Sequence, residues 1–267
     1  MESRPTVIVT GASSGIGSAI AERFAAEGWR VFPTMRRPGA EAGADCLALD
    51  VTDDASAAAC VAKVIARAGR IDALVNNAGI TLMGAAEETS MAEAERLFAT
   101  NFFGVHRMAR AVLPHMRARR QGRIVTIGSI AGFLPKPFEA FYSAAKHALE
   151  GYVESLDHEL RDFGIRALLI EPGFVQSSLA TNMQHAAARI ADYAAARGRA
   201  EALLAQDVGG GVPPSAVADA VLRAVSQPHP PLRIRVGGDA AQLHFLRHWA
   251  PGFVFDRGLR QRFGLEV

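Results

Sequence analysis

The sequence predicts an α/β protein with a doubly wound parallel sheet in three layers (α/β/α), and three observations support this fold class. Short apolar runs rich in β-branched residues alternate with longer segments of helical periodicity. A glycine-rich turn separates the first such run from the first helical segment. The chain has 267 residues, 49% hydrophobic and 21% charged, which suits a protein with a substantial core. Doubly wound folds often reach this length as one unit, so we expect residues 1–267 to form a single domain.

The expected strands and helices follow one another in strict alternation. The expected strands are 6–10, 30–35, 45–49, 73–75, 123–127, 166–170 and 232–236. The helical patterns among them are 55–67, 91–117, 142–163 and 215–226, with a further one directly after the glycine-rich turn. Such alternation is typical of a parallel sheet with helices on both faces.

One alanine-rich stretch, residues 178–211, interrupts this alternation between the sixth and seventh strands. It ends in three consecutive glycines, and a proline pair follows soon after. An insertion at this point lies above the carboxyl ends of the strands, where a small helical lid over a substrate is expected. The alternative is a pair of surface helices with no gating role.

Residues 238–267 form a C-terminal extension rich in Phe, Arg and His, with Trp249 among them. It could cover a pocket, form a subunit interface or lie against a membrane surface. His244 and His248 have a helical spacing compatible with metal ligands, but no third ligand lies near them in the sequence. We therefore predict no metal site.

The charge balance argues against a nucleic-acid-binding protein. The net charge is +2, and the one local basic cluster is Arg117, Arg119 and Arg120. Cations are favourable at the C-terminus of a helix, so this cluster is interpreted as the solvated end of one.

The cysteine content and the N-terminus favour a cytoplasmic protein. Cys46 and Cys60 form neither a disulfide framework nor a metal-binding spacing, so we expect a reducing compartment. The N-terminus lacks a positive-then-apolar signal sequence, and no apolar run approaches the ~20 residues that a transmembrane helix needs.

The glycine-rich turn indicates a dinucleotide site. Residues 6–10 form a β-branched run that leads into Gly11, Gly15 and Gly17 and then into a helical pattern. Glycines remove the Cβ atoms that would keep a pyrophosphate away from the backbone. The N-terminus of the following helix offers unpaired N–H groups and a partial positive charge. The turn also contains Ser13, Ser14 and Ile16.

A tyrosine and a lysine four residues apart, Tyr142 and Lys146, indicate proton-transfer chemistry. This spacing places both side chains on one face of a helix. A phenol has a pKa near ~10, and a neighbouring ammonium lowers that pKa toward neutrality. We therefore expect Tyr142 to exchange a proton near neutral pH.

Taken in order, these motifs resemble those of the short-chain dehydrogenases/reductases, in particular the compact, single-domain hydroxysteroid and retinol dehydrogenase-like members. The resemblance spans about residues 5–236 and implies a Rossmann-like fold. It rests on Thr10 with the glycine turn, Asp50-Val51, Asn76-Asn77-Ala78-Gly79, the set Asn101, Ser129, Tyr142 and Lys146, and Pro172-Gly173.

The resemblance implies a role for each catalytic position. Tyr142 would give a proton to the carbonyl oxygen in reduction and take it in oxidation. Lys146 would lower the pKa of Tyr142 and hold the nicotinamide ribose. Ser129 would hydrogen-bond the substrate oxygen, and Asn101 would support a water that resupplies the proton. Read alone, Ser129 could simply end a strand and Asn101 could be a polar residue inside a helix.

The resemblance also implies the cofactor positions. They are Gly11, Ser13, Ser14, Gly15, Ile16, Gly17, Asp50, Val51, Asn77, Ala78, Gly79, Tyr142, Lys146, Pro172, Gly173, Val175 and Ser177. Ser177 stands where the family usually has a threonine. A serine keeps the hydroxyl but lacks the methyl group that restricts the side chain, so we expect binding with less rigidity.

The residues after the second strand predict NADP(H) in preference to NAD(H). An acidic residue there would bind the ribose 2′-hydroxyl of NAD, whereas an arginine accommodates a 2′-phosphate. This chain has Arg36 and Arg37 and no acid. We expect Arg36 to be the main contact and Arg37 a secondary one; the alternative is two surface arginines.

The substrate prediction is a bulky, hydrophobic carbonyl or secondary alcohol resembling a steroid, a retinoid or an aryl ketone. Phe133, Phe138 and Phe174 would line its pocket together with Ser129 and Tyr142, because small-molecule sites are mostly apolar with few polar groups. The alternative for the phenylalanines is a place in the core.

Two other functions stay open: a 3-oxoacyl-thioester reductase, and a non-catalytic NADP-binding regulatory protein. An intact Ser129, Tyr142 and Lys146 set favours an enzyme over a pure binding protein. By analogy with the family, we also expect a homodimer or homotetramer that pairs through long helices.

Overall fold

The seven-stranded parallel sheet at the centre of the molecule confirms the predicted fold class. The computed structural model describes residues 4–39, 43–176 and 183–265, and all structural statements below refer to these residues. The strands follow the order β3-β2-β1-β4-β6-β7-β9, and every neighbouring pair is parallel. The crossover connections run through helices on both sides of the sheet, as in a doubly wound fold.

The sheet strands are β1 (Thr6–Val9), β2 (Arg30–Met35), β3 (Leu47–Ala48), β4 (Ala73–Asn76), β6 (Gly122–Ile127), β7 (Ile165–Pro172) and β9 (Arg233–Val236). A separate two-stranded ribbon pairs β5 (Leu82–Met83) with β8 (Gln184–His185). The helices are α1 (Gly15–Ala26), α2 (Asp54–Ala68), α3 (Met91–Phe98), α4 (Gly104–Arg119), α5 (Ala140–Leu160), α6 (Ala194–Gly209), α7 (Pro214–Ser226), α8 (Gly238–Trp249) and α9 (Gly252–Arg262).

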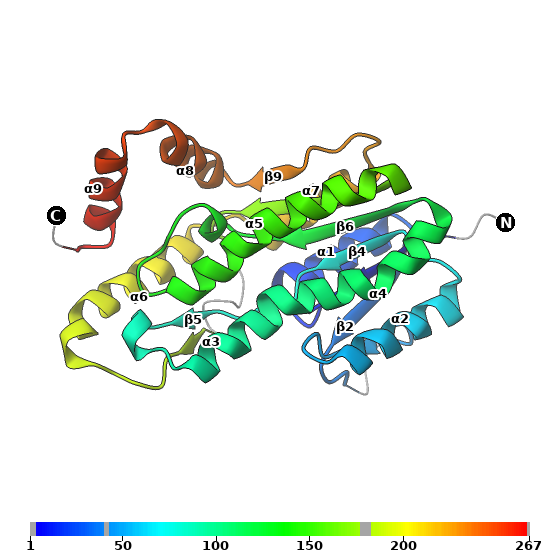
Figure 1. Cartoon of the computed structure of the whole chain (residues 1–267), viewed down its shortest axis with the longest axis horizontal. Coiled ribbons are helices and arrows are strands. Elements are labelled where there is room, and N and C mark those ends of the chain that lie inside the picture. The colour runs from blue at the N-terminus through cyan, green and yellow to red at the C-terminus, as the bar shows by residue number, and fades with distance from the viewer. Residues whose placement is uncertain (1–3, 40–42, 177–182, 266–267) are drawn as a thin grey trace.

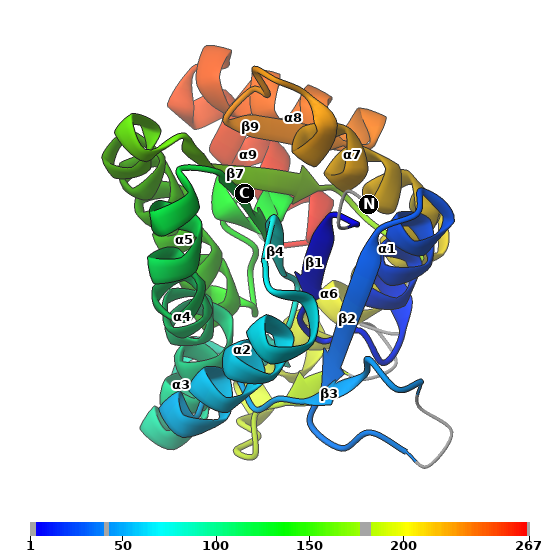
Figure 2. The same cartoon turned by 90° about the vertical axis from the view of Figure 1, so that its right-hand side faces the viewer.

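Two apolar cores lie on opposite faces of the sheet. Helices α2, α4 and α5 cover one face, and α1 and α7 cover the other (Figure 2). Side chains alternate along a strand, so Ile8 of β1 enters the first core while Val7 and Val9 enter the second. Both faces of the central strands are therefore buried, which explains their uninterrupted apolar sequences.

The long helix expected over 91–117 is divided in the structure. Helix α3 ends at Phe98, five residues form a π-helix from Ala99 to Phe103, and α4 begins at Gly104. The side chain of Asn101 in this wide turn binds both backbone groups of Ile80: its Oδ1 accepts from the Ile80 N–H at 2.8 Å and its Nδ2 donates to the Ile80 carbonyl at 2.8 Å. Periodicity alone gave no signal of this interruption.

The insertion after β7 lies at the carboxyl ends of the strands. Of the insertion predicted over 178–211, the structure describes residues 183–211, which contain β8 and α6. The extension contains α8 and α9, which project beyond the sheet near α6 (Figure 1). Within the described residues, no helix combines the length and apolar character needed to cross a membrane.

Candidate active site

A cavity of about 790 Å³ lies at the carboxyl ends of β1, β4, β6 and β7, and it brings most of the predicted site residues together. We call this cavity the cleft. The predicted residues that line it are Gly11, Ser13, Ser14, Gly15, Ile16, Arg36, Asp50, Val51, Asn77, Ala78, Gly79, Ser129, Tyr142, Lys146, Pro172, Gly173, Phe174 and Val175. Gly17, Arg37, Asn101, Phe133 and Phe138 lie outside this lining, and Ser177 lies outside the described residues.

The glycine turn at one end of the cleft depends on close backbone approaches. A Cβ on Gly17 would lie 2.3 Å from the Gly11 carbonyl oxygen and 2.5 Å from Asn77 Nδ2. Asn77 Nδ2 donates to the carbonyl groups of Thr10 and Gly11 at 2.9 and 3.0 Å, which ties the loop after β4 to the turn. Gly17 and Asn77 therefore shape the turn, while Gly15 and Ile16 present the first turn of α1 to the cleft. These features fit the pyrophosphate of a dinucleotide.

Arg36 lies at the carboxyl end of this part of the sheet, directly after β2. Its side chain is exposed and lines the cleft, whereas Arg37 is exposed and does not. Asp50 also lines the cleft, and hydrogen bonds from the hydroxyl and backbone N–H of Thr52 hold its pKa below the ordinary value, with a smaller effect of Arg36. Among the described residues, the lining directly after β2 therefore carries a guanidinium and no acidic side chain.

At the other end of the cleft, Ser129, Tyr142 and Lys146 lie next to one another. Ser129 follows β6, its Oγ accepts from the Ala131 N–H at 3.1 Å, and its side chain is close enough to Tyr142 to lower the pKa of that phenol. Tyr142 and Lys146 come from successive turns of α5, and both are buried. Lys146 Nζ lies 5.7 Å from the centroid of the Tyr142 ring and donates to the Ile127 carbonyl at 2.8 Å. The predicted side-by-side arrangement of amine and phenol is present.

The protonation of this group differs from the sequence-based expectation. Burial raises the pKa of Tyr142 well above its ordinary value, the nearby Glu139 carboxylate raises it further, and the Ser129 hydrogen bond lowers it. Burial lowers the pKa of Lys146 to about 8. The expected lowering of the Tyr142 pKa by Lys146 is not found in this arrangement, because burial has the largest effect and it raises that pKa. Tyr142 keeps its proton at neutral pH.

Asn101 lies behind the cleft. It is buried, and its amide holds the Ile80 backbone through the two hydrogen bonds described above. This contact fixes the loop after β4 beside Gly79, whose Cβ position is 3.4 Å from Asn101 Oδ1. Its predicted role in supporting a proton-resupplying water remains a prediction.

Of the three phenylalanines predicted at the substrate site, Phe174 lines the cleft. Phe133 packs beneath the C-terminal helices, with its ring 5.2 Å from that of His244. Phe138 lies 6.4 Å from the ring of Tyr193, on the segment before α6. Phe133 therefore contacts the extension and Phe138 contacts the insertion. The sequence did not predict where these two segments lie relative to the sheet.

Several lining residues were missed by the sequence analysis. Met183, Leu204 and Val208 reach the cleft from the insertion, and Lys136 and Glu139 reach it from the loop before α5. Only the i,i+3 spacing of opposite charges at 136 and 139 was a local signal of their pairing. Across the described ranges, no group of three or more His, Cys, Asp or Glu side chains is arranged to hold a metal ion.

Comparison with protein families gives a direct match. The family model described as short chain dehydrogenase matches residues 5–188, more than half of the chain. The chain belongs to the short-chain dehydrogenase family. It is therefore an oxidoreductase of the short-chain dehydrogenase/reductase type, as the sequence motifs predicted.

Two curated relatives illustrate the range of this family. A 3-ketodihydrosphingosine reductase of Bacteroides thetaiotaomicron is 35% identical over 259 residues, which cover 95% of this chain and 96% of the relative. Human retinol dehydrogenase 8 is 41% identical over 183 residues, which cover 63% of this chain and 58% of the relative. The second match spans little more than half of the relative's length.

Solved structures of short-chain dehydrogenases agree with the fold and with a nicotinamide cofactor. One from Streptomyces avermitilis has a TM-score of 0.81 at 37% identity and covers 99% of this chain and 97% of its own. One from Burkholderia phymatum, in complex with NAD, has a TM-score of 0.80 at 27% identity, with coverages of 92% and 93%. A serine dehydrogenase with NADP+ has a TM-score of 0.75 at 30% identity, with coverages of 88% and 95%. The second of these structures holds NAD and the third holds NADP+.

Proposed function

We propose that this protein is an NADPH-dependent reductase of hydrophobic ketones. The single observation that supports it best is the position of Ser129, Tyr142 and Lys146 at one end of a cleft whose other end is the glycine turn with Arg36. A nicotinamide dinucleotide, when bound, supplies a hydride to the carbonyl carbon. The chain then has to hold the carbonyl oxygen and give it a proton.

The Ser129 and Tyr142 hydroxyls would hold that oxygen, and Tyr142 would donate the proton. Reduction needs a tyrosine that is protonated before the reaction, and the raised pKa of Tyr142 supports that direction. Lys146 would hold the ribose and return a proton to Tyr142. Asn101 would support this transfer by fixing the loop at Ile80 and a water beyond it.

Arg36 supports NADPH as the preferred nucleotide. Its guanidinium lines the cleft directly after β2, where a 2′-phosphate would be placed. The apolar side chains of Phe174, Met183 and Leu204 support a hydrophobic substrate, and the insertion that carries two of them would act as a lid. The ketone- and retinoid-related names of the relatives agree with this class.

The test is NADPH oxidation by the purified protein with a panel of long-chain and aryl ketones, compared with Tyr142→Phe. We expect the variant to lose activity by about 10²–10⁴-fold while still binding NADPH by fluorescence titration. Equal turnover by the wild type and Tyr142→Phe would show that Tyr142 is not the proton donor. Faster turnover with NADH than with NADPH would show that the proposed preference for NADPH is wrong.

A further inference from the structure

A buried ion pair, Lys136–Glu139, lies in the cleft beside Tyr142, and the reaction proposed above does not use it. The two side chains form a salt bridge and are 9% and 3% exposed. Lys136 Nζ lies 5.8 Å from the centroid of the Tyr142 ring and 6.0 Å from that of Phe174. Both charged residues line the cleft, so a substrate at Tyr142 meets them.

Glu139 is held firmly by its backbone. Phe138, directly before it, has a positive φ of 63°, an unusual conformation for a large side chain. The Phe138 carbonyl accepts from the Gly84 N–H at 2.8 Å, and the Glu139 carbonyl accepts from the Ser143 N–H at 2.8 Å. Strained backbone of this kind persists only where its surroundings fix it, and it is common at functional sites.

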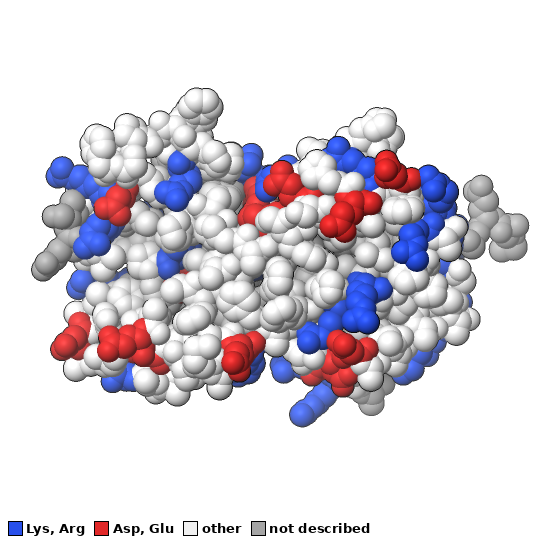
Figure 3. Space-filling model, in the orientation of Figure 1, with Lys and Arg blue, Asp and Glu red and all other residues white. Residues whose placement is uncertain are grey.

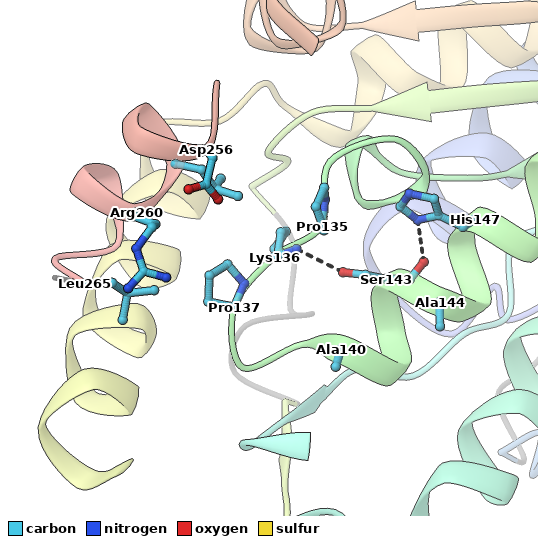
Figure 4. A pocket seen from close by; sticks show the side chains of 11 residues that line it. Pro135, Lys136, Pro137, Ala140, Ser143, Ala144, His147, Asp256, Arg260 and Leu265 are labelled. Carbon is cyan, nitrogen blue, oxygen red and sulfur yellow. Dashed lines mark hydrogen bonds between the residues drawn. The ribbon is translucent and has the colours of Figure 1, made fainter. Parts of the chain in front are cut away.

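Lys136, in contrast, has room to move. It also lines a second cavity of about 500 Å³ between residues 135–137, the start of α5 and helix α9 (Figure 4). Asp256 of α9 lines the same cavity and offers a second carboxylate, and Arg260 of the same helix lies in the lining beside it. The long, flexible lysine therefore has two places for its ammonium group, while the Glu139 carboxylate has one.

The energetics of the pair decide which ligand charge fits. A buried carboxylate that loses its cation is strongly destabilised, so a ligand that displaces Lys136 must replace its positive charge. An anionic ligand group would instead add a second negative charge beside Glu139. A cationic group on the substrate meets the requirement, and an anionic group does not.

We propose that Glu139 binds an ammonium group carried by the substrate near the carbonyl that is reduced. Lys136 occupies this site before the substrate binds and then turns into the second cavity toward Asp256. The substrate class is an amphiphilic amino ketone with an apolar body. This inference rests on the proposed ketone reduction and specifies its substrate.

The test compares two ketones of equal chain length, one with an amine on the carbon next to the carbonyl and one without, using the purified protein and NADPH. The measured quantity is the ratio of their KM values, in which effects on catalysis common to both ketones cancel. We expect the wild type to have a lower KM for the amino ketone than for the plain ketone. Glu139→Gln should weaken this preference at least tenfold, and Lys136→Met should strengthen it.

Several outcomes would overturn the inference. One is a ratio that neither variant changes, and another is a wild type that prefers the plain ketone or a carboxylated one. If Glu139→Gln does not fold, the Lys136→Met result decides alone. If neither ketone is turned over, or if Tyr142→Phe leaves turnover unchanged, the proposed function itself fails, and this result is distinct from an unchanged ratio.

A second, independent observation concerns the C-terminal helices. Seven large hydrophobic side chains in the described ranges are strongly exposed, and five of them lie within residues 245–254. Trp249 and Phe253 are 75% and 77% exposed. Figure 3 shows uncharged side chains projecting at the corner where α8 and α9 lie, with Lys and Arg beside them. We call residues 245–254 the exposed patch.

The charge of these helices indicates what covers the exposed patch. Residues 238–265 contain four arginines (Arg247, Arg257, Arg260 and Arg262) and two aspartates, and Arg262 forms a salt bridge with Asp207 of α6. A symmetric dimer through this patch would bring arginines of one copy toward those of the other. Anionic phospholipid, in contrast, matches both the basic charge and the exposed aromatic rings, which bury in the headgroup region.

We infer that α8 and α9 dock this protein on an anionic membrane surface. The test is sedimentation with vesicles of phosphatidylcholine alone or with one third phosphatidylglycerol, at low and high salt. We expect binding to the anionic vesicles that weakens with salt, and an approximately fivefold or greater loss for the double variant Trp249→Ser with Phe253→Ser. Met91→Ser with Phe103→Ser, exposed elsewhere, is the matched control. Absence of wild-type binding, or a dimer that only the first double variant dissociates, would overturn the inference.

Discussion

The two ends of the cleft are built in different ways. At the glycine turn, the lining consists largely of backbone and small side chains held by hydrogen bonds between strand ends, such as those of Asn77 to Thr10 and Gly11. At the substrate end, the lining consists of long side chains from segments far apart in the sequence, including Lys136, Phe174 and Leu204. Backbone geometry recognises a part that all dinucleotides share, whereas side chains distinguish one substrate from another. The cofactor end should therefore tolerate less change than the substrate end.

The strongest test of this difference is Gly17→Ala. The added methyl group would lie 2.3 Å from a backbone oxygen, so the turn has to shift. A displacement of about 1 Å near the reacting groups costs about 100-fold, and we expect a loss of this order in kcat/KM for NADPH. Gly151→Ala is the control, because Gly151 lies within α5 with nothing near its Cβ position. That variant should be unchanged or slightly more stable. Similar kinetics for both variants would contradict the assigned role of the turn.

The next test separates the two arginines after β2. Arg36 lines the cleft and Arg37 does not, although both are exposed. We expect Arg36→Asp to raise the KM for NADPH by about 10–100-fold, as expected when a charge-assisted contact is lost, and to change the KM for NADH little. Arg37→Asp is the matched control and should have a small effect on both. Equal changes for the two nucleotides would show that Arg36 does not select the phosphate.

The same difference explains how much the sequence could predict. The glycine turn, the strand before it and the Tyr142–Lys146 spacing are local patterns. Such patterns can be recognised in the sequence because the residues that form them are close together in the chain. The π-helix at Asn101 was missed because the backbone that the Asn101 side chain binds, at Ile80, is 21 residues away and leaves no trace in the local periodicity. The raised pKa of Tyr142 was missed because burial and the position of Glu139 are properties of the fold. The substrate end, to which the insertion contributes, depends almost entirely on contacts of this kind.

A smaller effect is expected on the substrate side of the insertion. Leu204 lines the cleft from α6, whereas Gln206 on the same helix is exposed and does not. Leu204→Ala should raise the KM for a hydrophobic ketone by roughly three- to tenfold, because part of an apolar contact is lost. The KM for NADPH should stay the same. Gln206→Ala is the control, and an equal effect of both variants would mean that α6 contributes only stability.

The smallest effect concerns Glu171, which lies on β7 directly before Pro172 and Gly173 of the cleft lining. It is 1% exposed, and burial together with the neighbouring Glu150 raises its pKa to about 7, against the lowering effect of Arg235 and Arg233. The folded protein therefore holds a proton on Glu171 in a pH range where the unfolded chain, with a pKa near ~4.3, has lost it. The stability from this group is complete below that unfolded pKa, falls as pH rises and is lost above about 7.

Glu171→Gln removes this titration and keeps a neutral side chain of the same shape. We expect the thermal midpoint of the variant, relative to wild type, to rise by several degrees between pH 5 and pH 8, since the free-energy change is at most about 3 kcal/mol. Glu154→Gln is the control, because Glu154 is ionised at both pH values: its pKa is lowered, chiefly by Arg233. If the difference between Glu171→Gln and wild type is the same at both pH values, Glu171 is already charged at pH 5. The contact between Glu171 and Arg235 would then be an ordinary ion pair.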